Sequence, residues 1–115
     1  MKTKTNELIG PALDWAVAES EGNVRLQYDS REGLIICNIL GWIPYRPSVA
    51  WAQGGPIIER EGITLRSCID GAAWDAELAY EETILAPGPT PLIAAMRCYV
   101  SSVLGEEVEV PGELL

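Results

Sequence analysis

The segment from Thr90 to Gly105 constrains the fold most, because it has the pattern of an apolar helix with both ends marked. Thr90 can cap the first turn, Pro91 suits the first helical position, and Gly105 follows the last turn. Apolar residues recur along the segment at helical spacing. The residues of this apolar stripe and its edges are Leu92, Ile93, Met96, Tyr99, Val100, Val103 and Leu104. We therefore expect a helix over residues 91–104.

The rest of the chain predicts a second helix and several strands. Residues 11–20 have helical spacing, and Gly22 is placed to end that helix. Residues 24–28 alternate as a half-buried strand does, and residues 34–40 form an apolar hairpin partner. Further strand-like segments lie at 57–67, 74–78 and 106–111. The prediction is an α+β fold in a single domain, residues 1–115, with an antiparallel sheet of about four to five strands packed by two helices (about 11–20 and 91–104).

Residues 41–56 are expected to form an irregular loop, because six of them are glycine or proline. Trp42, Tyr45 and Trp51 lie in this segment, although loops are ordinarily polar and exposed. These aromatic side chains either fold inward as a lid over the core or line a pocket. The sequence leaves both interpretations open.

The charge of the chain excludes several functions. The 115 residues include seventeen acids, eight bases and no histidine, for a net charge of -9. An acidic surface repels phosphate backbones, so long nucleic acid is not an expected partner. The lack of histidine removes Ser-His and Cys-His nucleophiles and histidine metal ligands. The excess of acidic residues is unevenly distributed along the chain. Residues 1–68 carry eight acids and seven bases, whereas residues 69–115 carry nine acids and one base, Arg97.

No segment predicts export or membrane insertion. The basic start lacks the apolar run of a signal peptide, and the longest apolar stretch, residues 34–40, is too short to span a bilayer. Cys37, Cys68 and Cys98 cannot all pair within one chain, and each has apolar neighbours, which favours buried free thiols in a reducing compartment. We expect a cytoplasmic protein with no membrane partner.

No set of residues predicts catalysis or metal binding. Glu59 and Glu61 would lie on one side of a strand, but alternate acids on a strand are more often solvated than catalytic. The pairs and clusters at Asp70 and Asp75, and at residues 106–109, match no metal-binding spacing. We expect a protein that is not an enzyme and holds no metal or cofactor.

A site for a small anionic ligand is better supported. Gly54 and Gly55 can expose backbone N–H groups to an anion, and the helix start at Thr90 offers a second anion site. Bases can stack on Trp42, Tyr45 and Trp51. Phosphate can pair with Arg46, Arg60 and Arg66. The alternative is that the aromatic residues belong to the core, the glycines form turns and the arginines neutralise neighbouring glutamates.

Three stretches together resemble a known family. They are residues 12–18 (ALDWAVA), 51–61 (WAQGGPIIERE) and 88–100 (GPTPLIAAMRCYV). This combination is similar to the NinX-like family of small bacteriophage proteins, whose function is unknown. The resemblance covers nearly the whole length. It departs at residues 9–11, where the family has a threonine and no proline, so the cap of the first helix is in question.

The resemblance implies a phage accessory protein in the cytoplasm of an infected bacterium, of a kind that often counters host defence. Gln53 and Arg97 join the candidate ligand-binding residues because they lie within the family-like stretches, as Trp51, Gly54, Gly55 and Thr90 do. One hypothesis is a homo-oligomeric, non-enzymatic protein that sequesters a small nucleotide immune signal. The other is an acidic inhibitor that binds a host nucleic-acid-interacting enzyme through the surface of residues 69–115. Arg97 either contacts phosphate or pairs with Glu81 or Glu82.

Overall fold

A helix at the centre of the fold, α3 (Pro91–Leu104), organises the rest of the chain. The computed structural model describes residues 1–22, 25–29, 31, 33–38, 41–68, 71–79 and 81–115, and the backbone alone at 25, 33–38, 41 and 42. Residues 92–100 are buried without interruption, so α3 is covered on all sides. The Thr90 side chain accepts a hydrogen bond from the Ile93 N–H at 3.1 Å. The predicted helix and its cap are therefore confirmed.

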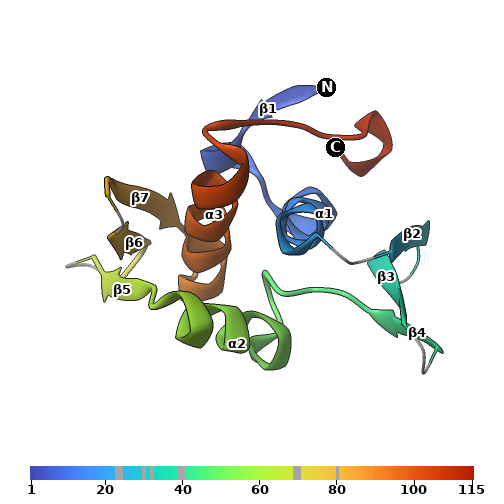
Figure 1. Ribbon diagram of the computed structural model, residues 1–115, viewed down its shortest axis with the longest axis horizontal. Coiled ribbons are helices and arrows are strands. Elements are labelled where there is room, and N and C mark those ends of the chain that lie inside the picture. Colours follow the sequence, from blue (N-terminus) through green and yellow to red (C-terminus); the bar gives the residue numbers. More distant parts are fainter. Residues whose placement is uncertain (23–24, 30, 32, 39–40, 69–70, 80) are drawn as a thin grey trace.

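One side of α3 packs on a three-stranded antiparallel sheet (Figure 1). Its strands are β5 (Thr64–Ser67), β6 (Trp74–Ala79) and β7 (Thr83–Gly88), in the order β5-β6-β7. Ala76 of β6 pairs with Ala86 of β7, and both are buried. Small residues at this position let the helix approach the sheet closely.

The helix α1 (Gly10–Glu21) packs against α3. Leu13, Ala16 and Val17 of α1 are fully buried, as the helical spacing predicts. The helix ends at Gly22, whose N–H donates to the Ala18 carbonyl. No side chain caps its start, where Ile9 stands. This agrees with the departure from the family pattern at residues 9–11.

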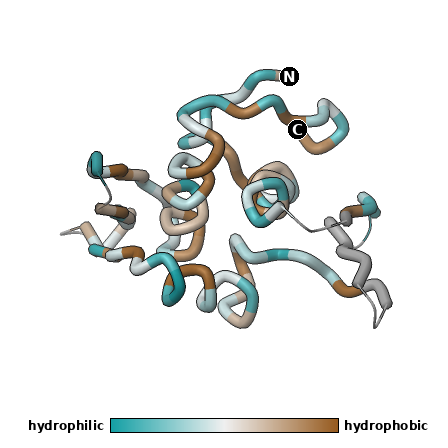
Figure 2. Tube along the Cα trace, in the orientation of Figure 1, coloured by the Kyte–Doolittle hydropathy of each residue, from teal (hydrophilic) through white to brown (hydrophobic). Residues whose placement is uncertain are grey.

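Two smaller sheets complete the fold. The hairpin predicted from residues 24–40 is present as β2 (Arg25–Asp29) and β3 (Gly33–Asn38), and β4 (Gly41–Pro44) pairs with β3. β1 (Lys2–Lys4) pairs with β8 (Glu107–Glu109), and short 3-10 turns follow at Thr5–Glu7 and Gly112–Leu114. In Figure 2 the run after α3 alternates between teal and brown, in line with Val108 and Val110 buried between exposed glutamates.

The predicted α+β class with antiparallel pairing is confirmed, but the strands do not join into one sheet. Among the described residues they form three separate sheets, and there are three α-helices instead of two. Figure 1 shows α1 and α3 standing between the β2–β4 meander and the β5–β7 meander. The helices thus separate strands that the pattern alone would place side by side.

The third helix, α2 (Trp51–Glu61), corrects two predictions. Residues 41–56 are not an irregular loop, because β4 and the first half of α2 lie there. Residues 57–61 are not strand, and the strand begins only at Thr64. Each glycine costs a helix about 1 kcal/mol and an internal proline about 3 kcal/mol, so Gly54, Gly55 and Pro56 argued against this helix. Packing against α3 outweighs that cost.

Candidate functional site

The ten candidate ligand-binding residues do not form one site. Trp42 lies in β4, and its side chain is outside the described part of the structure. Tyr45, Arg46, Trp51, Gln53, Gly54 and Gly55 lie around the start of α2, Arg60 lies near its end, and Thr90 and Arg97 belong to α3 with its cap. The structure therefore divides the set into three groups with different environments.

The glycine pair does not present free N–H groups to a ligand. The Gly54 N–H donates to the Ala50 carbonyl at 2.9 Å inside the first turn of α2. A Cβ atom at Gly54 would collide with the Pro47 carbonyl oxygen and approach Leu92 Cδ2 to 2.7 Å. Glycine is needed here because α2 packs closely on α3, so the interpretation as an anion-binding loop is wrong.

Gln53 and Tyr45 hold the start of α2 in place. Gln53 Oε1 accepts a hydrogen bond from the Arg46 N–H at 2.6 Å, and its Nε2 donates to the Pro44 carbonyl at 2.7 Å. Tyr45 is buried in the core, so its ring has no face free to stack on a base. These contacts fix the backbone between β4 and α2 and thereby fix where Arg46 and Trp51 stand.

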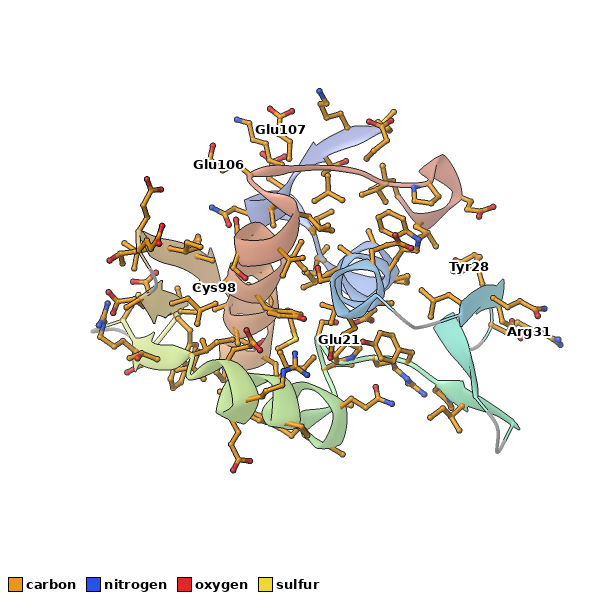
Figure 3. The ribbon with its side chains drawn as sticks, viewed as in Figure 1. Glu21, Tyr28, Arg31, Cys98, Glu106 and Glu107 are labelled. Atoms are coloured by element: carbon orange, nitrogen blue, oxygen red, sulfur yellow. The ribbon has the colours of Figure 1, made fainter. Side chains whose placement is uncertain are left out.

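Arg60 is held by a cluster at the end of α2. It donates to both carboxylate oxygens of Glu21 at 3.1 and 2.9 Å and to Glu61 at 2.8 Å. Its guanidinium also lies over the Tyr99 ring, 5.6 Å from the centroid, and the Tyr99 hydroxyl donates to Glu21 at 2.7 Å. Arg60 therefore neutralises glutamates, the alternative left open by the sequence, and links α1, α2 and α3 (Figure 3, where Glu21 is labelled).

Arg97 is bonded to the backbone inside the protein. Its Nε donates to the Leu8 carbonyl at 2.8 Å and its Nη1 to the Pro87 carbonyl at 3.0 Å, with 9% of the residue exposed. Burial lowers the pKa of this guanidinium from its ordinary value. Neither Glu81 nor Glu82 pairs with it. Arg97 thus joins the start of α1, the end of β7 and α3, while Thr90 is used as the α3 cap.

Two of the candidate residues remain free at the surface. Trp51 is 55% exposed, and Arg46 is exposed and makes no ion pair within the part of the chain that the structure describes. The Ala50 N–H donates to the Arg46 carbonyl at 2.8 Å, so this backbone bond connects Arg46 to the residue that precedes Trp51. Ala50 offers no side-chain cap to α2. An exposed indole, an unpaired guanidinium and an uncapped helix start therefore belong to the segment that leads into α2.

A buried carboxyl group lies behind this surface. Asp14 of α1 is 4% exposed, and its Oδ1 accepts a hydrogen bond from the Ser48 N–H at 2.9 Å. Burial raises the pKa of Asp14 to about 6, against the opposing effects of Ser48 and the Arg46 charge. Asp14 therefore tethers α1 to the segment that leads into α2, and its protonation state changes in a mildly acidic range.

The Asp14 pKa predicts how stability depends on pH. The native pKa of about 6 is above the ordinary value of 3.8, so the native state binds the proton more tightly than the unfolded state. This contribution to stability is present below the ordinary pKa and is lost as pH rises through 6. Between pH 4.5 and pH 7.5 the wild type should lose about 2 kcal/mol of unfolding free energy relative to Asp14→Asn, measured by urea denaturation. Glu19→Gln on the exposed face of α1 is the control, and its unfolding free energy should change with pH as that of the wild type does. If the unfolding free energies of Asp14→Asn and the wild type changed equally with pH, the prediction would be contradicted.

A cleft of about 590 Å³ lies elsewhere, between β7 and the paired ends of the chain. Its lining comprises Lys4, Asn6, Glu82, Thr83, Ile84, Leu85, Ser101, Glu106 and Glu107. Sequence reasoning missed it, because β7 was not predicted and β1 was not expected to pair with β8. The excess of acids in residues 69–115 pointed to this part of the chain without showing that it forms a cleft.

The acidic part of the chain is largely uncompensated at the surface. Its single base, Arg97, is buried, whereas the carboxylates of this part are mostly exposed. Glu107 and Glu109 pair with Lys2 and the N-terminal amine at 3.8 and 3.1 Å, and Glu77 pairs with Arg66 at 3.2 Å. The exposed acids that make no ion pair among the described residues are Asp75, Glu81, Glu82, Glu106 and Glu113.

The remaining reactive groups do not assemble a chemical centre. Glu59 and Glu61 lie two residues apart in a helix and so point to different sides. Cys98 is a buried free thiol, as expected, and burial raises its pKa to about 11. Cys68 is free but partly exposed, and the Cys37 side chain lies outside the described residues. Within the described ranges no group of three or more Cys, Asp and Glu side chains is placed to hold a metal ion.

The fold and its surfaces define a small acidic α+β protein with a central buried helix. Residues 4–102 match the family model described as Bacteriophage P22, NinX, and the chain therefore belongs to this phage protein family. No curated protein matches the chain. Among the described residues, none of the helices has the length and apolar character needed to cross a membrane.

Proposed function

We propose that the protein is a non-enzymatic phage accessory protein that binds and sequesters a small nucleotide in the host cytoplasm, as a counter-defence function. The observation that carries this proposal is that Trp51, 55% exposed, and the exposed, unpaired Arg46 both belong to the segment that leads into α2. The membership in a phage protein family agrees with an accessory role. Sequestration requires affinity and no general acid or base, which is compatible with a chain that lacks histidine.

The chemistry of this surface suits a nucleotide. Base stacking on an aromatic side chain contributes roughly 1–3 kcal/mol, and Trp51 offers a large exposed ring for it. The Arg46 guanidinium can donate two hydrogen bonds to one phosphate. The first N–H groups of α2 have no side-chain cap, and the helix dipole favours an anion at that end.

A second copy of the chain would complete the site. The Trp51 surface is open, and a ligand bound there would keep one side in water. Small ligands are held best where most of their surface is buried, which an interface between two copies provides. We therefore include a homo-oligomer in the proposal, and native mass spectrometry would report the subunit number and any nucleotide that co-purifies.

Binding of nucleotides should depend on Trp51 and Arg46. We expect one member of a panel of cyclic and linear nucleotides to release heat on mixing and to quench tryptophan fluorescence. Trp51→Ala and Arg46→Ala should each weaken that binding roughly tenfold or more, because each removes a main contact. Arg31→Ala removes an exposed charge that pairs with Asp29 in β2, away from α2, and is the control. No heat and no quenching with any nucleotide from the folded wild type would rule the function out.

The second candidate function is an acidic inhibitor that binds a host nucleic-acid-interacting enzyme through the surface of residues 69–115. The observation in its favour is that the only base of this part, Arg97, is buried, while five of its carboxylates are exposed and make no ion pair among the described residues. Such a surface presents negative charge in the way that a phosphate backbone does. It would occupy a basic groove without a specific ligand pocket.

An inhibitor of this kind should bind its partner in a salt-dependent manner. Exposed charges are screened over about 8 Å at physiological ionic strength, so raising the salt should weaken the complex steeply. Affinity capture from bacterial lysate at low and high salt would measure this. The variant Glu82→Gln/Glu106→Gln/Glu113→Gln should weaken capture, and Glu7→Gln/Glu19→Gln/Glu59→Gln, which removes three exposed charges from the other part of the chain, should not. A partner that is retained equally at high salt would argue against this function.

A further inference from the structure

The strand β7 has a free edge beside the cleft. β6 pairs with β7 along the whole strand, from Ala79 opposite Thr83 to Trp74 opposite Gly88. On the other side no strand of the described residues pairs with β7. An unpaired edge presents backbone donors and acceptors that can receive another strand, and native proteins ordinarily cover or interrupt such edges.

The cleft lies along the first part of this edge, at Thr83, Ile84 and Leu85. Farther along β7, Pro87 has no N–H, and its carbonyl already accepts a hydrogen bond from Arg97. Ile84 points toward the core and Leu85 points to solvent with 58% exposed, yet both residues line the cleft. A cleft over one face of the sheet would be lined by only one of these two, since neighbouring residues of a strand face opposite sides. The volume of about 590 Å³ lies within the range of about 300–1,000 Å³ that is typical of ligand sites.

The charge around the cleft is negative. Glu82, Glu106 and Glu107 line it, and Lys4 is the one basic residue in the lining. Glu107 pairs with Lys2 at 3.8 Å, whereas Glu82 and Glu106 make no ion pair with any described residue. Figure 3 shows Glu106 and Glu107 at the end of α3. That helix end adds partial negative charge, and its last turn contains no basic residue to offset it.

We infer that this cleft is the docking groove for an extended, basic segment of a partner protein, which adds as a strand to the free edge of β7. The inference rests on the second candidate function, the acidic inhibitor, and names the surface and the chemistry of its partner. Backbone hydrogen bonds to β7 supply affinity, and alternate side chains supply specificity. Lysine or arginine side chains on one face meet Glu82 and Glu106, while apolar side chains on the other cover Leu85.

Other occupants fit these features less well. Nucleic acid is repelled by the carboxylates and the helix end. A bare metal ion would need a tight group of ligands, and the described residues contain no such group. The backbone donors and acceptors of a strand edge have the spacing of a second polypeptide strand.

The test uses synthetic peptides with the full-length protein. A peptide that alternates arginine with valine should bind by calorimetry, and the same peptide methylated on alternate backbone nitrogens should bind roughly tenfold or more weakly, because it cannot complete the strand pairing. Glu82→Gln/Glu106→Gln should weaken binding of the first peptide roughly threefold to tenfold. Asp75→Asn/Glu113→Gln removes the same charge away from the cleft and should leave binding within twofold of wild type.

Equal binding of the methylated peptide, or an equal loss in both double variants, would overturn the inference, because attraction would then be general and not localised to the β7 edge. Circular dichroism of each variant confirms that it is folded before binding is measured.

The inference and the function on which it rests fail differently. If a basic partner is captured from lysate in a salt-dependent manner but Glu82→Gln/Glu106→Gln captures it equally well, the docking groove is wrong and the inhibitor function stands. If the peptide binds the cleft but no basic partner is captured, the docking groove stands and the inhibitor function is wrong.

Discussion

Replacing Arg97 with alanine should lower the free energy of unfolding by about 3 kcal/mol, because the substitution removes two charge-assisted hydrogen bonds and leaves their acceptors without partners. Those acceptors are the carbonyls of Leu8 and Pro87, at 2.8 and 3.0 Å. Arg97 therefore connects α3 and β7 to Leu8, which lies 89 positions earlier in the sequence. Urea denaturation followed by circular dichroism would measure the loss.

Two further variants, Arg97→Lys and Arg66→Ala, test whether the loss of stability comes from the buried guanidinium of Arg97. Lysine has one ammonium group and cannot reproduce the fork of guanidinium donors, so it should recover less than half of the lost stability. Arg66 pairs with Glu77 at the surface, and its removal should cost about 1 kcal/mol or less. An Arg97→Ala protein of nearly wild-type stability that no longer binds nucleotide would contradict this role and return Arg97 to the ligand site.

Replacing Gly88 with alanine should cost about 3 kcal/mol, because strand β7 meets α3 there with no room for a side chain. A Cβ atom at Gly88 would lie 2.5 Å from the Ala94 nitrogen and 2.8 Å from its Cα. Both atoms belong to the helix backbone, so the clash cannot be relieved by turning a side chain. The helix must move away from the sheet, which disturbs the packing of α3 on β7. The midpoint of urea denaturation should fall accordingly.

Gly112→Ala is the matched control for Gly88→Ala. No atom lies within 4 Å of the position that a Cβ would take at Gly112, and its backbone conformation is not reserved for glycine. Its effect should stay within about 0.5 kcal/mol. If both variants lost the same stability, the cost would come from backbone entropy and not from the contact of β7 with α3.

Local patterns in the sequence were sufficient for the two helices at the ends of the chain and for the first hairpin. Thr90, Pro91 and Gly105 mark the ends of α3 through their own backbone and side-chain chemistry, without help from distant residues. The same holds for Gly22 at the end of α1. The helix α2 was not predictable in this way. Its residues 54–56 disfavour a helix locally, and the contact of Gly54 with Leu92 and Pro47 explains the glycine at position 54.

The candidate site shows the same division. Residue types indicated which side chains can bind an anion. They did not indicate which of these side chains already bond to other residues of the protein. Arg60 meets Glu21, 39 positions earlier, and Arg97 meets Leu8, 89 positions earlier. No local pattern encodes these partners. Only Trp51 and Arg46 stay free at the surface among the candidates with described side chains, and the cleft beside β7 arises from segments at opposite ends of the chain.

The sequence by itself determined the α+β class, the capped central helix and the uneven charge, because helix ends, strand alternation and ionisation are properties of neighbouring residues. The tertiary structure alone decided that the strands form three sheets, that Gly54 and Gly88 are packing positions, and that the one base of the acidic part is buried. The physical reason is that close packing and hydrogen-bond satisfaction depend on which distant segments meet. Because Arg97 is buried against backbone carbonyls, the exposed carboxylates of residues 69–115 have no base from their own part of the chain at the surface, and a charge imbalance in the sequence becomes a negative surface on the folded protein.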